Sequence, residues 1–84
     1  MHYDVVSVTL LGHLKLLVRF ADGLEGEVRF EPSHLYGVFE ALKDPETFRR
    51  VGCDDGFVAW PGDIDLAPDA MYDAIKEHRE WVLS

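Results

Sequence analysis

Apolar residues alternate with polar ones along the first third of the chain, and a period of two is typical of β-strands. Three such runs are present, each expected to place its apolar residues on one face: Val6, Val8 and Leu10; Leu14, Leu16, Val18 and Phe20; Leu24, Val28 and Phe30. Gly12-His13 separates the first two runs, and Ala21-Asp22-Gly23, which contains a hairpin-favouring Asp-Gly pair, separates the others. The pattern predicts an antiparallel three-stranded meander.

The positions between these apolar residues are mostly charged. They are Lys15, Arg19, Glu25, Glu27 and Arg29. Opposite charges on neighbouring strands can pair, so we expect this face of the sheet to be exposed to water. Leu17 shares the face with these charges.

After Phe30 the apolar spacing becomes helical. Pro32 favours a short helical turn that carries Leu35 and Tyr36, and a second turn has an apolar stripe. The stripe comprises Val38, Phe39 and Leu42. Gly37 lies between the two turns, and glycine inside a helix costs about 1 kcal/mol relative to alanine. Two short turns are therefore expected in place of one helix.

Three further elements are predicted. Asp44-Pro45 has the cap and first-turn residues of a short helix. The β-prone runs 50–53 and 57–60 flank Asp54-Asp55-Gly56 as a second hairpin, which Pro61-Gly62 ends. A final helix of three to four turns begins at Pro68, with Met71, Ile75 and His78 or Arg79 on one face, and Trp81 and Val82 trail beyond it or extend it.

Together these elements predict an α+β fold. It has a three-stranded antiparallel meander, a second short hairpin, short helices, and a C-terminal helix, with the helices packed on one sheet face. The chain has 84 residues, which suits a single domain spanning residues 1–84 with one core.

Charge and cysteine content narrow the classes of function. Eight basic and sixteen acidic residues give a formal net charge of −8, which disfavours binding of nucleic acid or anionic membranes by this chain alone. Cys53 is the single cysteine, so no internal disulfide can form. There is no long apolar run, and the start lacks the basic region of a signal peptide. We therefore expect a cytoplasmic protein.

An acidic cluster is the most conspicuous chemical feature. It comprises Asp54, Asp55, Asp63, Asp65, Asp69 and Asp73. Counted from Asp63, the glycine and glutamate positions of an EF-hand hold Pro68 and Ala74, so that motif is absent. Asp63, Asp65 and Asp69 remain weak candidates for a looser divalent-metal site, although aspartate beside proline and glycine is common in turns and caps.

Other site chemistry is missing from the sequence. The four histidines lack zinc-ligand spacing, the serines lack a nucleophile elbow, and the glycines form no phosphate loop. We expect no enzymatic activity and no cofactor. The remaining candidates are residues for protein interaction, because exposed apolar and aromatic side chains are enriched at hot spots. They are Leu17, Tyr36, Trp60 and Trp81. For Trp60, beside Pro61, a role in the core is favoured over recognition.

Three motifs occur in order between Val5 and Tyr72: F-x-D-G at 20–23, L-x-D-x-x-x-F at 42–48 and W-x-x-x-x-D-L-x-P at 60–68. In this combination the chain resembles the bacterial domain-of-unknown-function family 2442. The resemblance implies an α+β domain similar to the N-terminal part of a bacterial DNA-binding regulator, and the helix-turn-helix part that follows in that regulator is not expected in this chain. Shorter members resemble one half of a toxin–antitoxin gene pair. The shared motif positions are expected to serve as turn, cap and core residues.

The leading hypothesis from these observations is a non-enzymatic interaction or regulatory module, in the form of an acidic partner of a small basic protein. The alternative is a domain that binds a small ligand or a divalent metal at the segment Asp63–Asp73. A third option is a structural homodimer.

Overall fold

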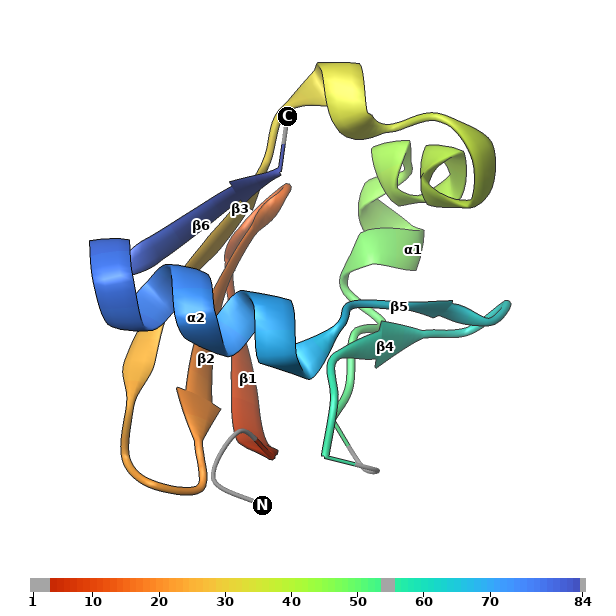
Figure 1. The fold of residues 1–84 in the computed structure, drawn as a ribbon. Helices are drawn as coiled ribbons and strands as arrows, with labels where there is room; N and C mark the ends of the chain where they lie inside the picture. Colours follow the sequence, from red (N-terminus) through yellow and green to blue (C-terminus); the bar gives the residue numbers. More distant parts are fainter. Residues whose placement is uncertain (1–3, 54–55, 84) are drawn as a thin grey trace.

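The computed structural model describes residues 4–53 and 56–83. Its main element is a four-stranded sheet with the strand order β1-β2-β3-β6 (Figure 1). The strands are β1 (Val5–Gly12), β2 (Lys15–Phe20), β3 (Glu25–Phe30) and β6 (Glu80–Leu83). The first three pair antiparallel in chain order, which confirms the predicted meander and the α+β class.

The fourth strand corrects the prediction for the end of the chain. Helix α2 (Pro68–His78) ends at Arg79, which has a φ of 65° and donates its backbone N–H to the Ile75 carbonyl over 2.8 Å. This left-handed residue turns the chain back along β3, where Trp81 pairs in parallel with Val28. Trp81 and Val82 therefore belong to a strand. Four residues are too few for a strand period to stand out beside a helix.

Strand β1 differs from its predicted alternation at one end. A register shift between Val5 and Ser7 places Val5 opposite Phe20, and Val5 is buried whereas Val6 is 54% exposed. Beyond the shift, Val8 is opposite Val18 on the core side as expected. Leu10, opposite Leu16, is 43% exposed because β1 is an edge strand. The inserted residue of a bulge leaves no trace in a period-two pattern.

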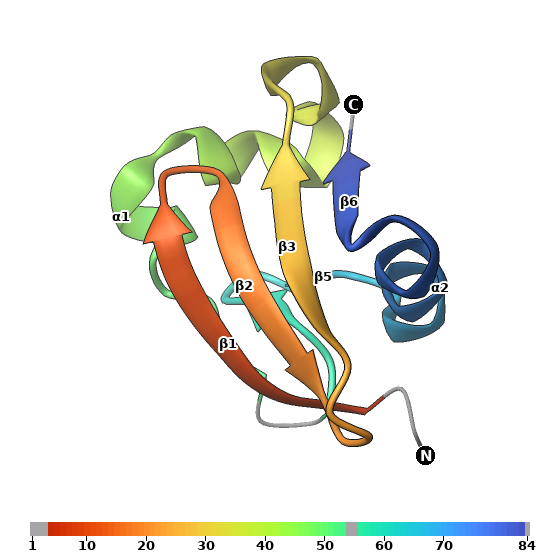
Figure 2. The ribbon, with the colours of Figure 1, turned by 90° about the vertical axis from the view of Figure 1, so that its left-hand side faces the viewer.

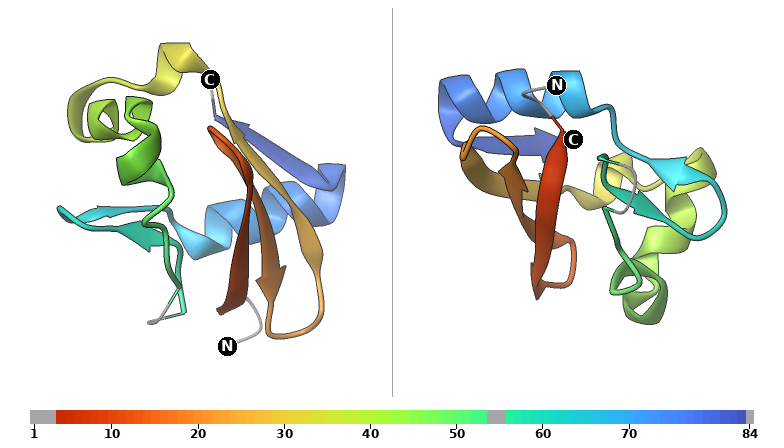
Figure 3. Two further views of the ribbon diagram at one scale, coloured as in Figure 1. Left: turned by 180° about the vertical axis from the view of Figure 1, so that it is seen from behind. Right: turned by 90° about the horizontal axis from the view of Figure 1, so that it is seen from below.

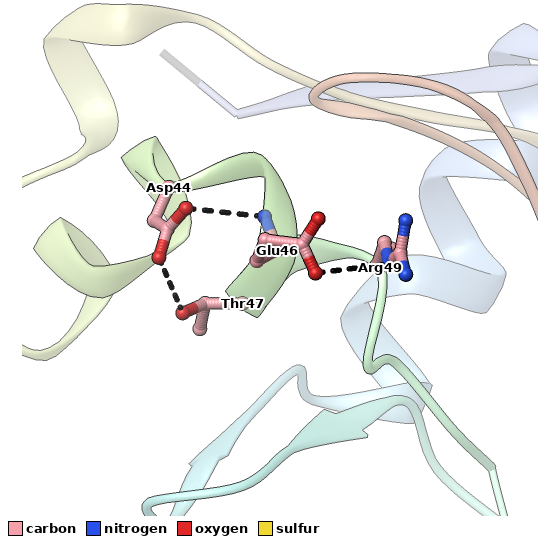
Figure 4. Close-up of polar contacts among 4 residues, drawn as sticks. All are labelled: Asp44, Glu46, Thr47 and Arg49. Atoms are coloured by element: carbon pink, nitrogen blue, oxygen red, sulfur yellow. Dashed lines mark hydrogen bonds and ion pairs between the residues drawn. The ribbon is translucent and has the colours of Figure 1, made fainter.

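Two 3₁₀ helices follow the meander, η1 (Pro32–His34) and η2 (Gly37–Lys43), so the two separate turns are confirmed. Helix α1 (Pro45–Phe48) starts at the predicted cap. The Asp44 carboxylate accepts hydrogen bonds from the Glu46 backbone N–H over 3.1 Å and from the Thr47 hydroxyl over 3.3 Å (Figure 4). Glu46 also forms an exposed ion pair with Arg49.

The second hairpin exists but uses different residues. It consists of β4 (Ala59–Trp60) and β5 (Ile64–Asp65), joined by the turn 61–63. Pro61-Gly62, expected to end a hairpin, forms its turn, with φ values of 93° at Gly62 and 64° at Asp63. In the run 50–53, only Gly52 pairs with the second run, through an isolated bridge to Ala59. Asp54 and Asp55 of the expected turn lie outside the described residues.

The helices and the small hairpin lie on one side of the main sheet, as Figures 1 and 3 show. The core fills the space between these layers, with Leu16, Val18 and Val28 of the sheet fully buried. Gly26 allows α2 to approach β3, because a Cβ there would lie 2.5 Å from the Ile75 side chain and 2.7 Å from the Arg79 carbonyl. In Figure 2 no described helix stands in front of the other face of the sheet.

Candidate interaction surface at the edge of the main sheet

The uncovered face of the sheet, here called the outer face, carries paired charges. Cross-strand ion pairs join Lys15 to Glu27 at 3.7 Å and Arg19 to Glu25 at 4.0 Å, and Arg29 pairs with Glu80 at 3.6 Å. This confirms the charged, water-exposed face predicted from the sequence. Three basic and three acidic residues leave the outer face without net formal charge, so the remaining five basic and thirteen acidic residues carry the whole charge of −8.

Strand β1 is the uncharged margin of this sheet. None of its eight residues, Val5–Gly12, is ionisable. Three of its apolar side chains are substantially exposed: Val6 at 54%, Leu10 at 43% and Leu11 at 47%. Edge strands normally carry charges, proline or a covering element that prevents further pairing. Among the described residues, no strand pairs with the outer edge of β1.

Backbone hydrogen bonds show which groups of β1 face that open edge. Phe20 of β2 donates its N–H to the Leu24 carbonyl, and Phe30 of β3 donates its N–H to the carbonyl of Leu14, the residue before β2. Alternate residues from Leu14 to Phe20 therefore direct their backbone polar groups toward β3. On β1, Leu10 and Val8 lie opposite Leu16 and Val18 of β2, respectively. By the alternation of an antiparallel ladder, Val8 and Leu10 therefore direct their N–H and C=O groups away from β2.

The beginning of the same edge is already occupied. Val5 donates its N–H to the Gly56 carbonyl over 2.8 Å, so this group is already bonded and is not open to an added strand. The register shifts again between Leu10 and Gly12, near the turn into β2. The regular open stretch is therefore residues 7–10.

The four residues proposed from the sequence do not form one patch. Leu17 lies on the outer face, half-buried and opposite Thr9 and Glu27. Tyr36 is 69% exposed between η1 and η2, with its ring centroid 6.0 Å from that of His34. Trp81 is half-buried on β6 and packs against the core.

Trp60 is a core residue. Only 4% of it is exposed, and its indole N–H donates to the Phe48 carbonyl over 2.8 Å. Its ring also lies 5.9 Å, centroid to centroid, from that of Phe30. It therefore leaves the set of surface candidates, in line with the structural role favoured from the sequence. Val6 and Leu10 were missed as surface candidates because strand alternation places them on the core face, and the sequence does not show that their strand lies at the edge of the sheet.

The proposed metal ligands Asp63, Asp65 and Asp69 lie in three different settings: the hairpin turn, β5 and the first turn of α2. All three are exposed, and Asp69 accepts a hydrogen bond from the Ala70 backbone N–H. Within residues 4–53 and 56–83, no three histidine, cysteine, aspartate or glutamate residues are grouped so that they could hold a metal ion. Asp63 is thus a turn residue, Asp65 a strand residue, and Asp69 bonds within the first turn of α2.

One partly buried polar contact connects α2 to the main sheet. The Tyr72 hydroxyl donates to the Asp22 carboxylate in the β2–β3 turn, and the other oxygen of Asp22 accepts the Leu24 backbone N–H. This hydrogen bond raises the pKa of Tyr72 above its ordinary value of 10.0, and burial and the negative charges of Asp22 and Asp73 raise it further. Asp22, predicted as a turn residue, also connects the β2–β3 turn to α2 through Tyr72.

No helix in the described part of the chain is both long and apolar enough to span a membrane. Comparison with curated proteins and with solved structures finds no match for this chain. Comparison with protein families finds one described as "Protein of unknown function (DUF2442)", which matches residues 5–77. That range begins with the first residue of β1 and reaches the penultimate residue of α2, and it includes all three motifs noted in the sequence. Since the match covers most of its length, the chain belongs to this family of proteins of unknown function.

Proposed function

We propose that this domain is a non-enzymatic protein-interaction module, which binds its partner by adding a strand to β1. The single observation behind the proposal is the open edge of β1, where an uncharged strand has exposed Val6, Leu10 and Leu11 side chains. A strand added to a sheet edge is held by backbone hydrogen bonds and by side-chain contacts at alternate positions. The open edge of β1 provides groups for both kinds of contact.

The energetic case depends on desolvation. An incoming strand would remove water from Leu10 and Leu11, and burial of apolar surface contributes roughly 25 cal/mol per Å². The same strand would satisfy the outward N–H and C=O groups of Val8 and Leu10. Because no charged group on β1 has to be desolvated, these gains are not offset by the cost of burying an ion.

A finer form of the proposal concerns the role of the module. The net charge of −8 suits a regulatory subunit whose acidic regions attract a small basic protein, as in a toxin–antitoxin-like gene pair. In that arrangement the acidic part of the molecule would steer the partner, and β1 would supply the short-range contact.

The test is the mass in solution, measured by light scattering, of the protein alone and coexpressed with the products of neighbouring genes. We expect a stoichiometric complex in at least one preparation. Leu10→Lys should remove it, because the new charge would be buried in the interface. Ala70→Lys on the exposed side of α2 adds the same charge and should leave the complex intact. A monomer in every preparation, or a complex equally stable in Leu10→Lys, would rule out the proposal.

A further inference from the structure

We propose that the strand added to β1 is the β1 strand of a second copy of this chain, paired antiparallel about a twofold axis at Thr9. The two four-stranded sheets would then form one continuous eight-stranded sheet. This inference rests on the strand-addition function proposed above, and it takes a second copy of the chain, in place of the small basic protein of the finer form, as the partner at β1.

Charge distribution favours a second copy. Two chains of charge −8 repel each other over most of their surfaces, but β1 is uncharged and the adjacent outer face has three basic and three acidic residues. An approach through β1 therefore brings together the parts of two acidic molecules that repel least. A strand rich in basic residues would find no opposite charge on β1 to pair with.

The open stretch also fixes the register. Val8 and Leu10 have the outward backbone groups, and in an antiparallel pair centred on Thr9 each Val8 faces Leu10 of the other copy. Both pairs then exchange two hydrogen bonds, while Thr9 faces Thr9 in a non-hydrogen-bonded pair. This register uses the outward backbone groups of both Val8 and Leu10 in the regular stretch. It also stays clear of Val5, whose N–H is already bonded to Gly56.

Side chains agree with this register on both faces. On the core side, the pairs of Val8 with Leu10 extend the apolar layer formed by Leu16 and Val18. On the outer face, Thr9 meets Thr9 of the other copy, beside Leu17 of each β2 strand. Such twofold pairing is self-complementary, as a symmetric dimer interface requires.

The dimer should be reversible. A contact of about five residues per strand is smaller than the roughly 1,200–2,000 Å² buried in a standard stable interface. We therefore expect a dissociation constant on the order of 10 μM, with monomer and dimer exchanging as the protein concentration changes.

Cysteine cross-linking tests the register. In a Cys53→Ala background, Thr9→Cys places two thiols on the twofold axis, with Cα atoms about 4.5 Å apart, within the range that a disulfide spans. Ser7→Cys is the matched control, because it lies on the same strand and face but its two copies would be about 13 Å apart. Under mild oxidation we expect a covalent dimer from Thr9→Cys and a monomer from Ser7→Cys.

Light scattering over a hundredfold range of concentration completes the test with the protein alone. Mass should rise from monomer to dimer, and Leu10→Lys should stay monomeric throughout. A protein that is monomeric at all concentrations and gives no Thr9→Cys dimer overturns this inference. Such a protein could still form a complex with a neighbouring gene product that Leu10→Lys removes. In that case the proposed function holds, and only the second copy as partner is overturned. Dimers linked through Ser7→Cys, or dimers insensitive to Leu10→Lys, also overturn it.

Discussion

The two edges of the main sheet are built in opposite ways. β1 has eight residues, no charge and three exposed apolar side chains, whereas β6 has four residues and begins with Glu80, which pairs with Arg29 across the outer face. Two apolar residues of β6, Trp81 and Leu83, pack against the core. The short length of β6 and its charged first residue disfavour pairing with a further strand, whereas β1 is long and uncharged. Fold stability is thus concentrated at one edge and the potential for association at the other.

The difference also concerns support from the rest of the molecule. Helix α2 directly precedes β6 and contacts β3. The close approach at Gly26 of β3 therefore holds both the last turn of α2 and the start of β6 in place. On the other side, Val5 at the start of β1 donates a backbone hydrogen bond to Gly56. Changes at the β6 edge should therefore unfold the protein, and changes at the β1 edge should leave it folded.

The largest effect is expected from Gly26→Ala. The new Cβ would collide with the Ile75 side chain and with the Arg79 carbonyl, which is backbone and cannot move aside without displacing α2 or β6. We expect a loss of about 3 kcal/mol in the free energy of unfolding, measured by urea denaturation. Gly12→Ala is the control, because its Cβ would meet no atom within 4 Å. Equal effects of the two substitutions would contradict the close approach.

Trp81→Ala should come next. It removes a half-buried aromatic side chain that contacts the core, while the backbone pairing of β6 remains possible. We expect a loss of about 2 kcal/mol and no change in the self-association measured by light scattering. If Trp81→Ala dissociated the dimer and left stability unchanged, the roles of the two edges would be reversed.

A smaller and pH-dependent effect is expected at Tyr72. Because its pKa is raised in the folded protein, its stabilising contribution is complete below pH 10, the ordinary tyrosine value, and is lost as the pH rises through the raised pKa. Urea denaturation between pH 8 and about pH 11 should show stability falling at the alkaline end. Tyr72→Phe should be less stable at neutral pH, by less than Trp81→Ala, and should lose less on alkalinisation. Identical alkaline slopes for the two proteins would show that another group titrates.

The smallest effect on stability is expected from Leu10→Lys. Exposed substitutions usually change the free energy of unfolding by no more than about 0.5 kcal/mol, and Leu10 is 43% exposed. The variant should match the unsubstituted protein in urea denaturation while losing association. A loss above about 2 kcal/mol would mean that Leu10 supports the monomer, and its use as a probe of the interface would fail.

Local sequence patterns were sufficient for the elements that depend on neighbouring residues. The meander, the separate turns around Gly37, the Asp44 cap and the start of α2 at Pro68 each follow from spacing or from one special residue. The mixed sheet could not be predicted in this way. Pairing of β6 with β3 joins residues about fifty positions apart, and no local pattern specifies such a partner.

The surface was harder to predict than the fold. Leu10 satisfies the strand alternation whether its strand lies in the middle of a sheet or at its edge, so the sequence could not show that it is exposed. Aromatic content pointed to Trp60, which the fold buries because its indole N–H reaches the Phe48 carbonyl. The sequence feature that marks this surface is the absence of charged residues from Val5 to Gly12. It indicates an association surface only once the strand order shows that β1 lies at the edge of the sheet.

The parallel pairing of β6 also has a consequence for the route of folding. β1, β2 and β3 are adjacent in sequence and can form early, because short loops close at little entropic cost. β6 can join only after the intervening chain has placed α2 against β3. Until then the partly folded sheet is open at both edges, and a second chain can add to either one. Refolding at high concentration should therefore produce larger aggregates than the folded protein, whose growth ends once two β1 strands have met.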